Sequence, residues 1–215
     1  MIRHWLSSAL LALGTVALIS ACSEVPEEDT TQLTFQAGAH YRVLEFPVHQ
    51  DRNEPFIVEY LWVGCPYCQQ FEPILQGFKA ENPEVTFVRR HGSLTNRWIV
   101  DGRIFHAIDL LADHDMTPAI LEFYASKAPN LPGGEDLAQF VEEQGLDADE
   151  VFAKADSDEV NAIMADNLTD MDQNGMRGVP AIVVNGRYLV SNSLPENIAT
   201  SDDYYALLNY LLSLD

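Results

Sequence analysis

The chain has 215 residues, of which 47% are hydrophobic and 21% charged, and its net charge is −21. This length suffices for one domain of ordinary size or a small domain with an insertion, and the composition is that of a globular protein. Such an acidic surface repels nucleic acid, so we expect no nucleic-acid partner.

The N-terminal segment has the layout of an export signal. Residues 1–22 combine a basic residue, Arg3, with an uncharged apolar run and small residues before Cys22. The run is shorter than the ~20 apolar residues of a membrane-spanning helix, which argues against an uncleaved anchor. Its last four residues resemble a bacterial lipobox, so we expect a signal peptide at 1–21 and a lipid on Cys22. Ser23, in the sorting position, favours the outer membrane.

A polar, acidic stretch separates this signal from the folded part. Residues 22–34 show no apolar periodicity and are predicted to form a flexible, lipidated tether. Two extended segments follow, at 41–46 and 56–63. The second is apolar almost throughout, apart from Glu59, which is typical of a strand buried on both faces.

The sequence CPYC occupies positions 65–68, directly after the second strand. A helical pattern continues from there to Phe78, and proline is tolerated in a first helical turn because its missing N–H costs nothing there. We therefore expect Cys65 at the N-terminus of a helix. A strand at 85–90 would then complete a βαβ unit.

Helical spacing replaces strand signals between positions 96 and 174. Four helical segments are predicted, around 104–111, 121–124, 137–141 and 160–171.

Two strands, at 181–184 and 187–190, follow this helical region. They flank Asn185-Gly186, a dipeptide suited to a type I′ hairpin turn. An amphipathic helix at 202–214 ends the chain.

The spacing of Cys65 and Cys68 fits thiol:disulfide exchange. If a lipid blocks Cys22, these are the two remaining thiols, and the export signal places them in an oxidising compartment. The helix N-terminus would stabilise the thiolate of Cys65, which predicts Cys65 as the attacking, substrate-bound sulfur and Cys68 as the resolving one. An inert structural bridge and a metal-binding knuckle share this spacing and stay open as alternatives.

We expect no metal centre. Three cysteines cannot supply a four-cysteine zinc site within one chain. His106, His114 and the acidic residues of 113–115 lack ligand spacing, and we interpret them as solvated polar residues of helices.

Two longer motifs resemble the DsbA family, the bacterial thiol oxidases of the periplasm. One is EYLWVGCPYC at 59–68, followed by Phe-Glu at 71–72, and the other is RGVPA at 177–181, which leads into VNG at 184–186. The resemblance extends from about Phe35 to the C-terminus.

This resemblance implies an α/β fold of the thioredoxin-like class with an inserted helical domain. Residues 35–95 and 175–215 would form the thioredoxin-like domain, and residues 96–174 the insertion.

The resemblance also assigns roles to two further residues. Pro180 corresponds to a cis-proline that faces the cysteine pair and turns the Val179 backbone toward an extended substrate, the alternative being an ordinary trans turn. Glu59 corresponds to a buried acid beneath the pair, where burial would raise its pKa and let it relay the proton of Cys68. The alternatives are a surface carboxylate or one paired with an arginine at 89–90.

The residue between the cysteines departs from the family. Many of its oxidases have histidine where this chain has Tyr67, so we expect a less stabilised Cys65 thiolate and a milder oxidant. Pro66, Tyr67 and Val179 are expected to line the substrate-binding surface.

The implied activity is thiol:disulfide oxidoreduction. The Cys65–Cys68 disulfide would pass to reduced, unfolded exported proteins through a mixed disulfide at Cys65, without another cofactor. A membrane quinone oxidoreductase of the DsbB type would reoxidise the pair. We expect a monomer in the periplasm, held at a membrane by the lipid on Cys22. A reductase or isomerase, and a non-catalytic tethered binding module with a structural disulfide, are the alternatives.

Overall fold

The structure is a computed structural model, and it describes residues 33–214. The predicted signal peptide, the lipidation at Cys22 and nearly all of the tether lie outside the described residues and stay predictions. Within residues 33–214, no helix combines the length and apolar character needed to cross a membrane.

A mixed sheet forms the centre of the described part. Its strand order is β1 (Tyr41–Val43), β5 (Tyr188–Val190), β4 (Ala181–Val184), β2 (Phe56–Leu61) and β3 (Thr86–His91). Strand β2 pairs parallel with β3 and antiparallel with β4, and all its residues are buried, as its apolar run predicts.

Two local predictions about this sheet are confirmed. Helix α1 (Pro66–Glu81) connects the parallel strands β2 and β3, which completes the predicted βαβ unit. Strands β4 and β5 form a hairpin whose turn residues, Asn185 and Gly186, both have positive φ angles, 49° and 65°. A type I′ turn requires this conformation at both positions.

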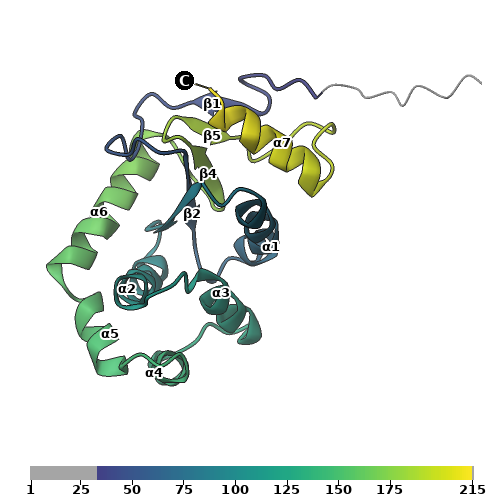
Figure 1. Cartoon of the computed structure of the whole chain (residues 1–215). Helices are drawn as coiled ribbons and strands as arrows, with labels where there is room; N and C mark the ends of the chain where they lie inside the picture. The colour runs from purple at the N-terminus through teal and green to yellow at the C-terminus, as the bar shows by residue number, and fades with distance from the viewer. Residues whose placement is uncertain (1–32, 215) are drawn as a thin grey trace, which may run out of the picture. The chain divides into compact units, whose positions relative to one another are not determined.

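Helices cover both faces of the sheet (Figure 1). Helices α1 and α7 (Ser201–Leu212) pack on the face that contains Ile57, whereas α6 (Asp158–Gln173) packs through Met171 on the opposite face, near Val58. Successive side chains of a strand point to opposite faces. Glu59 therefore shares the face of Ile57 and lies beneath α1.

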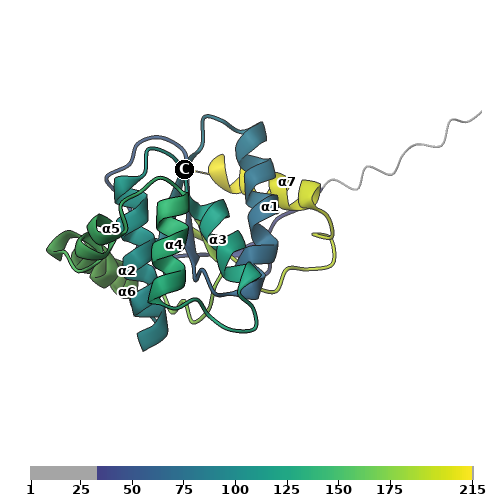
Figure 2. The same ribbon diagram turned by 90° about the horizontal axis from the view of Figure 1, so that it is seen from below.

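The chain between β3 and β4 is helical, as predicted. It forms α2 (Asn96–Leu111), α3 (Thr117–Ser126), α4 (Gly134–Glu143), α5 (Ala148–Ala155) and α6. Helices α2 to α5 gather at the end of the sheet where β2 leads into α1, and Figure 2, seen from below, shows α3 beside α1. They enclose an apolar cluster that includes both cysteines.

Some predicted elements differ from those observed. The first strand ends at Val43 rather than at position 46. Helix α5 was not predicted, because its eight residues are too few to show a clear helical period, although Asp147 caps its N-terminus through the Glu150 N–H.

Candidate active site

Cys65 and Cys68 lie at the start of α1, where their spacing places them. Cys65 is the residue that precedes the first helical turn, and Pro66 is the first helical residue. Both cysteines are thiols, and their sulfurs are hydrogen-bonded to each other. Cys65 keeps 7% of its surface exposed and Cys68 none, so Cys65 is the more accessible of the two.

The two thiols have opposite acidities. The hydrogen bond from Cys68, together with the N–H groups of Cys68 and Tyr67, lowers the pKa of Cys65 to about 6 against the opposing effect of burial. The same contact, followed by burial, raises the pKa of Cys68 far above its usual range. At neutral pH, Cys65 is therefore a thiolate and Cys68 a thiol.

The charge distribution along the helices favours this thiolate. Helices α4, α5, α6 and α7 each carry two acidic residues in their first turn, where a negative charge stabilises a helix, whereas α1, like α2 and α3, carries none. A carboxylate in that turn would repel the sulfur anion. Although the chain has a net charge of −21, the turn that follows Cys65 contains no carboxylate.

The residue before Pro180, Val179, makes the contact with the cysteine pair. The Val179-Pro180 peptide bond is cis, as predicted, and the trans alternative is wrong. The Cys65 sulfur lies 3.7 Å from the Val179 carbonyl oxygen. The structure thereby brings residues 65 and 179 together from opposite ends of the inserted helices.

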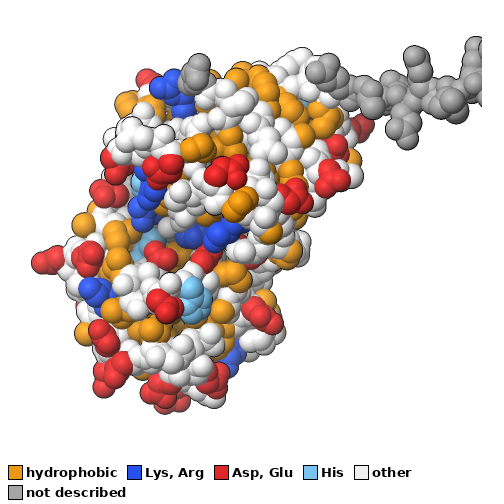
Figure 3. Space-filling view, in the orientation of Figure 1, with side chains coloured by type: hydrophobic (Ala, Val, Ile, Leu, Met, Phe, Trp, Pro, Cys, Tyr) orange, Lys and Arg blue, Asp and Glu red, His pale blue; other side chains and the backbone are white. Residues whose placement is uncertain are grey.

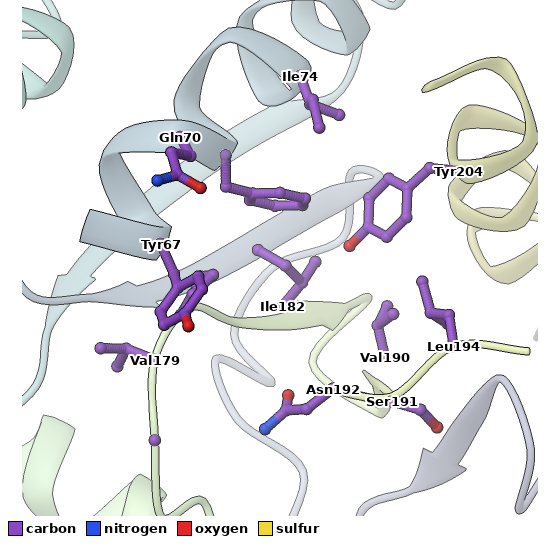
Figure 4. Close-up of a pocket in the computed structure, with 13 residues that line it drawn as sticks. Tyr67, Gln70, Ile74, Val179, Ile182, Val190, Ser191, Asn192, Leu194 and Tyr204 are labelled. Atoms are coloured by element: carbon purple, nitrogen blue, oxygen red, sulfur yellow. The ribbon is translucent and has the colours of Figure 1, made fainter. Parts of the chain in front are cut away.

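An apolar groove of about 610 Å³ is lined by Tyr67 and by Val179, whose carbonyl oxygen is the contact of Cys65 (Figure 4). Tyr67 and Val179 lie at its near end, Phe71 forms part of its wall, and Tyr204 of α7 lies at its far end. Tyr67 is 72% exposed, so its ring is free to contact another molecule. Burial raises the pKa of Tyr204, which keeps its hydroxyl group protonated as a hydrogen-bond donor.

Glu59 is fully buried between β2 and α1, so it is not a surface carboxylate. The structure pairs it with an arginine, as one alternative had it: Arg89 Nη1 donates to Glu59 Oε2, while Nη2 donates to Glu72 Oε1 at 2.9 Å. Burial raises the pKa of Glu72 to about 7. One arginine therefore bridges two buried carboxylates beneath the helix that carries the cysteines.

Asp101 organises the other side of the site, and the sequence analysis did not single it out. Its carboxylate is 1% exposed and accepts hydrogen bonds from Trp62 Nε1 at 2.9 Å, Tyr124 Oη at 2.8 Å and Arg97 Nε at 2.8 Å. The Trp62 carbonyl oxygen in turn accepts from the Cys65 N–H at 2.9 Å. The available signal was its position three residues before Ile104, which continues the apolar face of the helix predicted at 104–111 toward the N-terminus.

Replacing Asp101 by alanine should lower the free energy of unfolding by about 3 kcal/mol, because the buried Tyr124, the partly buried Trp62 and Arg97 lose their shared acceptor. Urea unfolding followed by circular dichroism measures this loss. The control is Glu54→Ala, which removes the exposed ion pair between Glu54 and Arg52 (2.8 Å) and should leave the free energy of unfolding nearly unchanged. Equal losses in the two variants would contradict the stabilising role of Asp101.

The histidines depart from the sequence interpretation in one respect. His106 is buried rather than solvated: its Nε2 accepts from the His91 N–H at 3.2 Å, and burial lowers its pKa. His114 is exposed and lies 2.6 Å from the Asp113 carboxylate. In the part of the chain that the structure describes, no cluster of three or more His, Cys, Asp or Glu side chains is arranged to hold a metal ion.

An acidic, accessible cysteine at a helix N-terminus, with a buried partner thiol and a cis-proline opposite, defines a thiol:disulfide oxidoreductase of the thioredoxin-like fold. Comparison with known proteins supports this class and narrows it. The family model described as DSBA-like thioredoxin domain matches residues 56–201. The chain belongs to this family and is a DsbA-like oxidoreductase.

Individual relatives agree over nearly the whole chain. The thiol:disulfide interchange protein DsbA of Azotobacter vinelandii is 30% identical over 207 residues, which cover 92% of this chain and 90% of the relative. The DsbA of Pseudomonas aeruginosa is 28% identical over 210 residues, or 94% of each chain. Its crystal structure superimposes with a TM-score of 0.70 at 26% identity, covering 83% of this chain and 93% of that one.

Proposed function

We propose that this protein donates its Cys65–Cys68 disulfide to reduced, unfolded exported proteins. The observation that carries the proposal is the opposite acidity of the two thiols, with the pKa of the accessible Cys65 lowered to about 6. A thiol of low pKa is a good leaving group, so the reduced form is favoured and the disulfide passes readily to a client.

The proposed transfer takes two exchanges. A client thiolate attacks the Cys65 sulfur, the Cys65–Cys68 bond breaks, and the Cys68 sulfur leaves with the electron pair and takes up a proton. A second client thiolate then attacks the client sulfur of the mixed disulfide, and Cys65 leaves as the thiolate. The client gains a disulfide, and the protein keeps both electrons as a dithiol.

Glu59 is the proposed relay for the proton that Cys68 takes up. Its Oε1 atom is buried and has no hydrogen-bond partner among residues 33–214, so one oxygen is available for a proton while the other binds Arg89. The proposed relay thus serves Cys68, the fully buried thiol, rather than Cys65.

The apolar groove and the Val179 backbone are the proposed client-binding surface. An extended client would pair with the Val179 backbone as an added strand, with Pro66 and Tyr67 beside its cysteine. Unfolded chains expose the apolar residues that the groove can take up. Among the structural neighbours, Proteus mirabilis DsbA carries a non-covalently bound peptide, PWATCDS.

The proposed setting is the periplasm, with a lipid on Cys22 holding a monomer at a membrane. The export signal and the family membership support it, and they support reoxidation by a membrane quinone oxidoreductase of the DsbB type. Residues 35–95 and 175–215 are proposed as the thioredoxin-like domain and residues 96–174 as the inserted domain.

The reduction potential, measured in glutathione redox buffers, tests the direction of transfer. We expect a potential above the glutathione poise, so that the oxidised protein forms disulfides in a reduced, unfolded test protein. A potential well below that poise would indicate a reductase, and efficient refolding of a scrambled protein an isomerase. Full biological activity of Cys65→Ser would instead indicate a binding module with a structural disulfide.

A further inference from the structure

A second, smaller hollow adjoins the groove around the end of strand β5. Its volume is about 230 Å³, and it shares four lining residues with the groove: Gly178, Val190, Ser191 and Asn192. The two hollows therefore form one continuous surface that begins beside Cys65.

The charged residues of this surface are positive, whereas the chain as a whole is strongly negative. Of the described residues that line the two hollows, Arg42 and Arg177 are the charged ones, and none is acidic. The whole chain has 33 acidic residues against 12 lysines and arginines, and acidic side chains are spread over the face shown in Figure 3. We call Arg42 and Arg177 the arginine rim.

Arg42 is held in place and still has free donors. Its guanidinium donates to the carbonyl oxygen of Asn174, whose side chain is fixed by a 2.8 Å hydrogen bond to the Phe46 carbonyl oxygen. This contact neutralises the C-terminal end of α6, which is a structural reason for an arginine here. It uses only part of a guanidinium with five N–H donors, and Arg42 forms no ion pair within residues 33–214.

Arg177 lies next to the backbone that faces Cys65. It precedes Gly178-Val179 in the chain, so a client segment paired with Val179 passes close to it. Its ion pair with Asp172, at 2.9 Å, is about 70% exposed on both sides. Exposed pairs of this kind contribute little and exchange readily for another carboxylate.

We propose that the arginine rim selects client segments in which an acidic side chain accompanies the apolar residues near the reacting cysteine. A carboxylate fits a guanidinium through two parallel hydrogen bonds, and the rest of this acidic surface would repel such a segment. The inference rests on the proposed function, because it specifies which clients the disulfide donor prefers.

Amidated peptides with one cysteine and two apolar residues test this selection. Each peptide carries either Glu or Gln at one of the positions two to six residues before the cysteine, and stopped-flow fluorescence gives its rate of reaction with the oxidised full-length protein. At low ionic strength, the Glu peptide should react about 3- to 10-fold faster than the Gln peptide at one or two positions. Rates with a small disulfide reagent correct for differences in thiol reactivity.

Two variants and one matched control complete the test. Arg42→Gln and Arg177→Gln should each reduce the preference for Glu, whereas Arg187→Gln, which removes the same charge at the β4–β5 hairpin outside both hollows, should retain it. Equal rates for Glu and Gln peptides with the unmodified protein would overturn the arginine rim and leave the proposed function intact. So would a uniform slowing of both peptides in Arg42→Gln. If the oxidised protein reacts with no peptide, the proposed function itself fails.

Discussion

Alkylation of the reduced protein is expected to show one fast thiol, Cys65, whose rate rises with a midpoint near pH 6, and one slow thiol, Cys68. The hydrogen bond from Cys68 stabilises the Cys65 thiolate, and the thiolate is the reactive species. Mass spectrometry of iodoacetamide adducts between pH 4 and 9 gives both rates. Cys65→Ser should remove the fast phase and lower disulfide exchange by about 1,000-fold or more.

A matched variant separates the hydrogen bond from the rest of the site. Cys68→Ser keeps Cys65 and replaces the thiol donor with a hydroxyl, so the fast phase should persist with a shifted midpoint, and a mixed disulfide formed at Cys65 should accumulate because the resolving thiol is missing. Two slow thiols that react like free cysteine would contradict the proposed mechanism.

The ionisation of Cys65 also connects redox state to stability. Its folded pKa, about 6, lies below the ordinary thiol value of 9.0, so ionisation stabilises the reduced fold fully above pH 9, and this contribution is lost as the pH falls through 6. A thousand-fold difference in ionisation corresponds to about 4 kcal/mol, which partial solvent exposure of the site reduces to about 2 kcal/mol. The oxidised protein has no such group, so the reduced form should lose stability relative to the oxidised form as the pH falls from 8 to 5.

Replacing Arg89 by methionine is expected to lower the free energy of unfolding by about 3–5 kcal/mol at pH 8, because two buried carboxylates lose their common partner. The loss should be smaller at pH 5. Glu72 already has a pKa raised to about 7, so the folded state favours its protonated form, and stability is lost as the pH rises through that value. Without Arg89, the ionised carboxylates have no cationic partner, so the loss of stability at high pH is larger.

Urea unfolding at pH 5 and pH 8 measures the effect. Arg52→Met is the control, since it breaks an exposed ion pair with Glu54 and should cost under about 1 kcal/mol at either pH. A loss in Arg89→Met that did not depend on pH would show that lost packing, rather than unpaired carboxylates, causes the destabilisation.

Local sequence signals predicted the core of the site. An uninterrupted apolar run defines β2, proline in a first turn defines the start of α1, and together they place Cys65 at a helix N-terminus. The cis peptide bond before Pro180 followed from the family resemblance instead, since no local pattern requires it. These features depend on residues that are close in sequence or belong to a known motif.

Partners from distant elements were harder to predict. The acceptor role of Asp101 depends on Trp62 from the end of β2 and Tyr124 from α3, and periodicity does not say which helix faces which. The pairing of Glu59 with Arg89 depends on strand register, which sets these two residues side by side on β2 and β3. The sequence analysis allowed this pair as an alternative but could not choose it without that register.

The start of α1, like that of α3, has no side-chain cap, and this affects how easily its first turn opens. Side-chain oxygens of Thr95, Ser157 and Thr200 accept backbone N–H groups at the starts of α2, α6 and α7, but no side chain caps α1. In the reduced protein the sulfur anion supplies the missing negative charge, and oxidation removes it. Backbone amides of this turn should then exchange their hydrogens with solvent faster in the oxidised form. The first turn of α1 would thus be most adaptable before a client arrives and most ordered after the client departs.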